Sequence, residues 1–129
     1  MNLVTGATGH IGNVLVRQLL AQGEDVRAML MPGEDPSPLQ GLDIERVEAD
    51  VLDFQSLLAA FRGIDVVYHL AGIITIMPGS NHLVHSVNVI GTRNVIQAAR
   101  LNHVRRLVYT SSIHALSRIP HGTIIDENV

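Results

Sequence analysis

The amino-acid sequence predicts an α/β fold, in which a doubly wound parallel sheet carries helices on both of its faces. Short apolar segments alternate along the chain with segments whose apolar residues recur at helical spacing. Strands and helices that alternate in this way are typical of parallel sheets, because each helix returns the chain to the same end of the sheet. The sequence is 47% hydrophobic but only 3% aromatic, so we expect an aliphatic core, as in buried parallel sheets.

The first half of the chain has the pattern strand, helix, strand, loop, strand. Residues 1–4, 25–31 and 44–49 are predicted strands, and the loop before the third strand is rich in proline and glycine. A helix is predicted over about residues 10–22 and ends at Gly23. Its apolar face is expected to consist of Ile11, Val14, Leu15 and Leu19.

The second half continues as helix, strand, helix, strand. Asp53 is predicted to cap a helix that ends at Gly63, and residues 64–70 and 106–110 are predicted strands. A long helix is expected over residues 80–102. One face of this helix carries Val84, Val87, Gly91, Val95 and Ala98. The expected strand order is 3-2-1-4-5, which leaves a crevice beside strand 1, where ligands bind at the carboxyl ends of the strands.

Composition excludes several classes of protein. A length of 129 residues suits one domain, and a net charge of −3 gives no reason to expect nucleic acid or an anionic membrane surface as a partner. The sequence contains no cysteine, no signal peptide and no run of about 20 apolar residues. We therefore expect a cytoplasmic protein without disulfides, and no metal site, because the histidines form no more than a weak pair at His82 and His85.

A glycine-rich turn separates the first strand from the first helix. It reads Thr5-Gly6-Ala7-Thr8-Gly9-His10-Ile11-Gly12. Turns of this kind hold the pyrophosphate of a dinucleotide, because the helix start offers unpaired N–H groups and the positive end of its dipole. Glycine turns also occur in ordinary α/β loops. Asp50, residues 70–72 and residues 110–112 also follow strands, so the fold is expected to bring them to the same edge of the sheet.

Five stretches together resemble the amino-terminal part of extended short-chain dehydrogenases/reductases. They are the glycine turn 5–12, Asp50-Val51, His69-Leu70-Ala71-Gly72, residues 87–95 (VNVIGTRNV) and Tyr109-Thr110-Ser111-Ser112. The last stretch is similar to the branch of dihydroflavonol reductases, 3β-hydroxysteroid dehydrogenases and related sugar-nucleotide epimerases. The resemblance implies that residues 1–129 form a Rossmann-type domain that binds NAD or NADP. It further implies an oxidoreductase or epimerase acting on an alcohol or carbonyl by hydride transfer, with a homodimer as one expected assembly.

The same resemblance assigns cofactor contacts residue by residue. The pyrophosphate contacts are Gly6, Thr8, Gly9, His10, Ile11 and Gly12. Asp50, with the Val51 backbone beside it, corresponds to the adenine contact, although a strand-end or capping aspartate is the alternative. Leu70, Ala71 and Gly72 correspond to the segment under the cofactor riboses, and a tight turn is equally compatible with these small residues.

Two residues correspond to catalytic positions of the family. Asn88 matches the helix asparagine that helps hold the catalytic geometry, and hydrogen bonding to neighbouring backbone alone is the equal alternative. Ser112 matches the serine that hydrogen-bonds the reacting oxygen, with Ser111 as the runner-up. The family's Tyr-x-x-x-Lys pair has no counterpart, because the sequence contains no lysine. We therefore expect a chain that lacks the C-terminal strands and the substrate lobe and is inactive by itself.

The choice between NAD and NADP stays open at the level of sequence. The second strand ends in Met29-Leu30-Met31, which supplies neither an acid for a ribose diol nor an arginine for a 2′-phosphate. Glu34 and Asp35 fall in the following loop, and Arg27 is badly placed for a phosphate. Neither cofactor is therefore favoured.

Substrate and catalytic competence also keep alternatives. The loop residues Ile73, Ile74, Ile76 and Met77 favour a small apolar substrate, although packing within the loop explains them equally well. A non-catalytic module that senses NAD(P), as in NmrA-like regulators, would explain the missing tyrosine–lysine pair. The matches at Asn88 and Ser112 argue against such a sensor.

Overall fold

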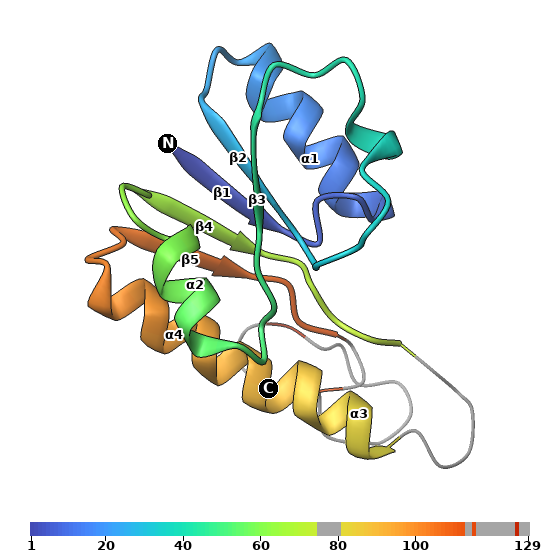
Figure 1. The fold of residues 1–129 in the computed structure, drawn as a ribbon, viewed down its shortest axis with the longest axis vertical. Coiled ribbons are helices and arrows are strands. Elements are labelled where there is room, and N and C mark those ends of the chain that lie inside the picture. The colour runs from blue at the N-terminus through green and yellow to red at the C-terminus, as the bar shows by residue number, and fades with distance from the viewer. Residues whose placement is uncertain (75–80, 113–114, 116–125, 127–129) are drawn as a thin grey trace.

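The computed structural model describes residues 1–74, 81–112, 115 and 126 of the chain. It contains a five-stranded sheet in the order β3-β2-β1-β4-β5, and every neighbouring pair of strands is parallel (Figure 1). The predicted strand order 3-2-1-4-5 is confirmed. The strands are β1 (Asn2–Thr5), β2 (Val26–Leu30), β3 (Glu45–Glu48), β4 (Val66–His69) and β5 (Arg106–Tyr109).

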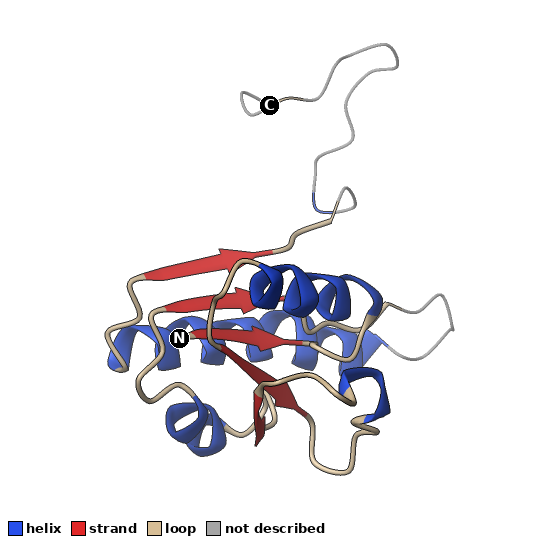
Figure 2. Ribbon diagram, turned by 90° about the horizontal axis from the view of Figure 1, so that it is seen from above, coloured by secondary structure: helices blue, strands red, loops and turns tan. Residues whose placement is uncertain are grey.

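Helices cover both faces of this sheet. Helix α1 (His10–Ala21) packs on one face, and α2 (Phe54–Ala60) and α4 (Thr92–Leu101) pack side by side on the other (Figure 1). Figure 2 shows neighbouring strands pointing in the same direction between these helices. A short 3₁₀ helix, η1 (Ser37–Leu39), follows β2. Because all strands run the same way, the segments that follow them meet at one edge.

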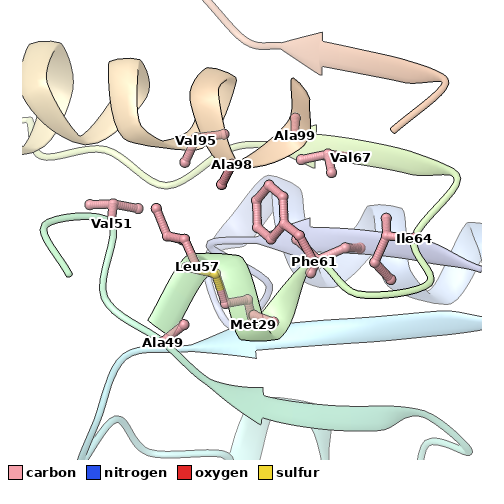
Figure 3. Packing of buried hydrophobic residues seen from close by; sticks show 12 residues of the cluster. Met29, Ala49, Val51, Leu57, Phe61, Ile64, Val67, Val95, Ala98 and Ala99 are labelled. Carbon is pink, nitrogen blue, oxygen red and sulfur yellow. The ribbon is translucent and has the colours of Figure 1, made fainter. Parts of the chain in front are cut away.

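The core forms two layers because side chains alternate between the two faces of each strand. Leu3 of β1 belongs to the layer beneath α2 and α4, whereas the next residue, Val4, belongs to the layer beneath α1. The α2–α4 layer is centred on Phe61, which has no exposed surface (Figure 3). Burying one such ring stabilises the fold by about 2–3 kcal/mol.

The predicted apolar face of helix α1 is right for Leu15 and Leu19, which pack in the core, and wrong for Ile11 and Val14. Ile11 and Val14 are 59% and 52% exposed, and the buried residues are Gly12, Val16 and Leu19. The cause is the glycine turn, because a Cβ at Gly12 would lie only 2.0 Å from the carbonyl oxygen of Gly6. This close approach fixes the rotation of the helix, and the positions four and seven residues further on then face the sheet.

The long helix predicted over residues 80–102 contains a feature that periodicity did not predict. It begins as α3 (Asn81–His85), widens into the π-helical segment η2 (Ser86–Gly91) and continues as α4. Gly91 and Val95 are buried as predicted, whereas Val84 and Val87 are half-buried. The N-cap prediction for α2 is confirmed, because the Asp53 carboxylate accepts hydrogen bonds from the backbone of Gln55 and Ser56.

Gly91 provides a test of how closely α4 must pack. A Cβ at Gly91 would lie 2.7 Å from Cγ2 of Val51, a side chain that is 7% exposed. Although alanine is about 1 kcal/mol better than glycine within a helix, the collision dominates. We expect Gly91→Ala to lower the free energy of unfolding by about 1–3 kcal/mol in urea titrations.

The matched background is Val51→Ala, which removes the colliding methyl groups. In that background Gly91→Ala is expected to cost much less stability, because only the contact with the Cβ of residue 51, at 3.0 Å, then opposes the helical propensity of alanine. An equal loss of stability in both backgrounds would contradict the packing explanation.

Candidate functional site

The glycine turn is built for close approach between backbone segments. Gly6 has φ +67°, and a Cβ at this position would lie 2.9 Å from the backbone nitrogen of Ala71. The residue must therefore be glycine, both for its conformation and for the space it leaves. The turn lies against the segment that follows β4, as the sequence predicted for two segments at the same sheet edge.

The start of helix α1 has no side-chain cap. Gly9 is the N-cap residue and offers no side chain, and the first turn carries no acidic residue. The first backbone N–H groups of a helix have no partner within the helix. These groups, together with the helix dipole, form a site for an anion.

A cavity of about 400 Å³ opens beside the turn at the carboxyl ends of the strands. Most of the predicted cofactor residues line it. They are Gly6, Thr8, Gly9, Asp50, Val51, Leu70, Ala71 and Gly72. The sheet topology thus brings together residues from three separate strand ends, as the sequence predicted.

Three predicted cofactor residues do not line this cavity. His10 and Ile11 have exposed side chains at the helix start, and Gly12 is buried under the turn. For these residues the structure leaves only backbone N–H groups as candidate contacts. Gly12 is also needed for packing, since its Cα lies against the Gly6 carbonyl.

Asp50 has the structural role that the sequence gave as one alternative, and it also lies at the cavity. Its Oδ1 accepts a hydrogen bond from the backbone nitrogen of Leu52 at 2.9 Å, which closes a short turn after β3. The residue also lines the cavity. A carboxylate has about four acceptor positions, so it can close the turn and still accept a hydrogen bond from a ligand.

Asn88, in the π-helical segment, holds the loop that follows β4. Its Oδ1 accepts from the backbone nitrogen of Ile73 and its Nδ2 donates to the Ile73 carbonyl, both at 2.8 Å. Ile73 itself lines the cavity. Asn88 therefore fixes one wall of the cavity through backbone. Ile74 is 99% exposed, and Ile76 and Met77 lie outside the described residues.

Ser112 and Ser111 follow the end of β5, and both are exposed. The carbonyl of Ser112 accepts a hydrogen bond from the backbone nitrogen of Ala115 at 2.9 Å. Neither serine lines the cavity. The predicted catalytic serine Ser112 thus follows β5, the strand next to β4, and is not among the residues that line the cavity.

A buried histidine, whose role the sequence did not reveal, connects these segments. His69 is 1% exposed. Its Nδ1 lies 2.8 Å from Oγ1 of Thr5, and its Nε2 lies 3.1 Å from Oγ1 of Thr92. Its ring stacks on Tyr109, with 5.5 Å between the ring centroids. The histidine therefore links β1, β5 and the helix that carries Asn88.

The hydrogen bonds around His69 determine its tautomer. The hydroxyl of Thr92 donates to the carbonyl of Asn88 at 2.8 Å, so its oxygen accepts from Nε2–H of the histidine. The Thr5 oxygen already accepts from the backbone nitrogens of Leu70 and Ala71. Its own proton is therefore donated to Nδ1, and the neutral ring satisfies every partner. We call this chain of hydrogen bonds, from Thr5 through His69 and Thr92 to Asn88, the buried relay.

Glu34 reaches the cavity although its position in sequence suggested a loop role. Oε1 accepts from the hydroxyl of Thr8, and Oε2 accepts from the backbone nitrogen of Met31 at 2.7 Å. A turn over Pro32 and Gly33 carries the chain back, with Gly33 at φ +78° and a 2.9 Å hydrogen bond from Glu34 nitrogen to Met31 oxygen. Proline followed by glycine is the signature of a type II turn, so the sequence could have predicted this turn but not the contact of Glu34 with Thr8.

A second hollow of about 480 Å³ lies at the opposite edge of the sheet, around Met1, Val26 and Ile44. It is formed at the amino ends of the strands, whereas ligands of such sheets bind at the carboxyl ends. In the described part of the chain, no three histidine, cysteine, aspartate or glutamate side chains are arranged to hold a metal ion. None of the described helices has the length and apolarity needed to cross a bilayer.

The parallel sheet, the glycine cradle and the uncapped helix start define a dinucleotide-binding domain of the Rossmann type. The model of the 3-beta hydroxysteroid dehydrogenase/isomerase family matches residues 3–128. The chain belongs to this family, which confirms the resemblance to extended short-chain dehydrogenases/reductases.

Individual relatives agree with this assignment. The chain is 46% identical to sterol demethylase protein B of Methylococcus capsulatus, covering 93% of this chain and 37% of that protein. It is 42% identical to cinnamoyl-CoA reductase 1 of Petunia hybrida, with 96% and 39% covered. The chain thus spans less than half the length of these relatives.

A solved structure shows the same fold. UDP-glucose 4-epimerase of Thermus thermophilus, crystallised with NAD, superimposes with a TM-score of 0.82 at 28% identity. The match covers 98% of this chain and 42% of the epimerase. The NAD in that structure agrees with the sequence prediction of NAD or NADP as the cofactor.

The buried relay predicts how stability depends on acid. Burial lowers the pKa of His69 from 6.5 to about 4. Between these values the unfolded chain binds the proton and the folded chain does not, so acid favours unfolding. Above pH 6.5 there is no such cost. We expect up to about 3 kcal/mol of stability to be lost as the pH falls through this window, measured by urea unfolding.

His69→Gln is the control for this pH dependence. It removes the titrating ring, so the variant is less stable near neutral pH but loses less in the same window. Asp35 and Asp65 also have lowered pKa values, through hydrogen bonds from Ser37 and from the N-terminal amine. The stability that these two carboxylates contribute is lost only at more acidic pH. It is the same in the original chain and in His69→Gln, so it cancels when the two are compared. An unchanged slope in the variant would contradict the assignment to His69.

Proposed function

We propose that residues 1–129 form the NAD(P)-binding domain of an oxidoreductase or epimerase that acts on an alcohol or carbonyl group. The observation that carries this proposal is the glycine cradle against Ala71, beside an uncapped helix start and a cavity. Two negatively charged phosphates fit such a site, because backbone N–H groups and the helix dipole favour anions. The family supports the same activity.

The adenosine half of the cofactor would be held by groups around the cavity. Asp50 is proposed to accept a hydrogen bond from the adenine amino group, with Val51 beside it. Leu70, Ala71 and Gly72 would lie under the riboses, where small residues let backbone approach a ligand. Backbone groups of residues 9–12 would bind the pyrophosphate. When bound, the cofactor supplies the hydride carrier for the reaction.

The reacting half of the site is proposed to use Ser112 and Asn88. Ser112 would donate a hydrogen bond to the reacting oxygen of the substrate. Asn88 would act as a positioning residue, because both ends of its amide are bonded to the backbone of Ile73. The sequence contains no lysine, so a tyrosine–lysine pair for proton transfer is not supplied by residues 1–129.

Titration of the purified chain with NAD and with NADP tests the cofactor proposal. We expect saturable binding of at least one dinucleotide by calorimetry, in a sample whose circular dichroism shows a folded α/β protein. Gly12→Ala is expected to weaken this binding by at least about tenfold, because the added Cβ displaces the turn and its N–H donors. The Cβ would meet the Gly6 oxygen at 2.0 Å.

Gly63→Ala is the matched control. Gly63 has φ +73°, but a Cβ there meets nothing within 4 Å. The control therefore carries the cost of a left-handed backbone without a collision, and dinucleotide affinity should stay within about twofold of the original. Absence of binding to both dinucleotides in a folded sample would overturn the proposed function.

A further inference from the structure

We infer that Glu34 makes this site select NAD over NADP. The inference rests on the proposed function, since it concerns which dinucleotide the cavity accepts. It also departs from the sequence pattern, because the end of β2 carries Met31 where an acid or an arginine would decide the matter.

The first support is where the carboxylate lies. Glu34 lines the cavity together with Thr8 and Gly9 of the glycine turn and Met31 at the end of β2. Hydrogen bonds to Thr8 and to the Met31 nitrogen hold it between the turn and the strand end. In a sheet of this type, the ribose nearest the adenine binds between these two segments.

The second support is the acceptor capacity of the carboxylate. Its two oxygens offer about four acceptor positions, and two are used by Thr8 and Met31. Those that remain suit the two hydroxyl groups of a ribose. A 2′-phosphate in the same place would instead be repelled, because it would lie against the negatively charged carboxylate of Glu34.

The third support is the charge of the cavity lining. Among the described residues that line it, the charged ones are Glu34 and Asp50, and no arginine is present. Arg27, on the neighbouring strand β2, is bound to Glu45 and to the carbonyls of Ala60 and Arg62. The lining therefore offers a 2′-phosphate two acids and no base.

The test compares NAD and NADP affinities of the chain with those of Glu34→Gln. We expect the chain to bind NAD at least about tenfold more tightly than NADP. The glutamine keeps the shape and removes the charge, so the preference should fall by about tenfold, mainly through tighter binding of NADP.

Asp35→Asn is the matched control, since it removes the same charge one residue away. The Asp35 carboxylate is exposed, accepts hydrogen bonds from the nitrogen and hydroxyl of Ser37, and does not line the cavity. The Asp35→Asn variant should therefore prefer NAD over NADP to the same extent as the original chain. Raising the ionic strength from about 0.05 M to about 0.5 M should narrow the preference of the original chain, without any substitution, because salt screens repulsion between charges.

Equal affinity of the original chain for both dinucleotides would overturn the inference while leaving the proposed function intact. So would an unchanged preference in a folded Glu34→Gln variant, or an equal change in Asp35→Asn. Failure to bind either dinucleotide would overturn the proposed function, and this inference with it.

Discussion

The hydroxyl of Thr5 is the contact on which the carboxyl edge of the sheet depends. It accepts hydrogen bonds from the nitrogens of Leu70 and Ala71 and donates to His69. These bonds hold the end of β4 against Thr5. The next residue is Gly6, and because it has no Cβ, the backbone of Ala71 can approach closely. A cradle this close requires both parts. The glycine permits the approach, and the threonine fixes it through hydrogen bonds to Leu70 and Ala71.

The buried relay extends this constraint across the site. From His69 it passes through Thr92 to the carbonyl of Asn88, and the Asn88 side chain then holds Ile73. A polar chain in the core is tolerated because each donor has an acceptor, whereas a half-satisfied chain would be costly. The glycine turn and the opposite wall of the cavity are therefore positioned by one set of bonds, which couples the geometry of the cofactor cradle to that of the π-helical segment.

Most of the fold could be predicted because its signals are local. Short apolar segments located the strands, and Asp53 marked a helix start. Helical periodicity placed Leu15 and Leu19 of α1 correctly but not Ile11 and Val14, because the contact of Gly12 with Gly6 fixes the rotation of the helix. The relay depends on register, in which Thr5 pairs with His69 and His69 with Tyr109. Register is a property of the assembled sheet. The turn at Pro32-Gly33 could be predicted from the sequence. The contact of Glu34 with Thr8 could not, because it depends on the assembled fold.

The proposed site therefore combines two kinds of selection. The helix start favours any anion, since a dipole and backbone donors do not distinguish one phosphate from another. Discrimination has to come from the walls, and these carry acids at Glu34 and Asp50. In the proposed site, an attractive centre with a negatively charged rim would accept a pyrophosphate and oppose an additional phosphate beside it. The proposed selectivity thus joins a penalty against the alternative to the acceptor positions that Glu34 offers a ribose.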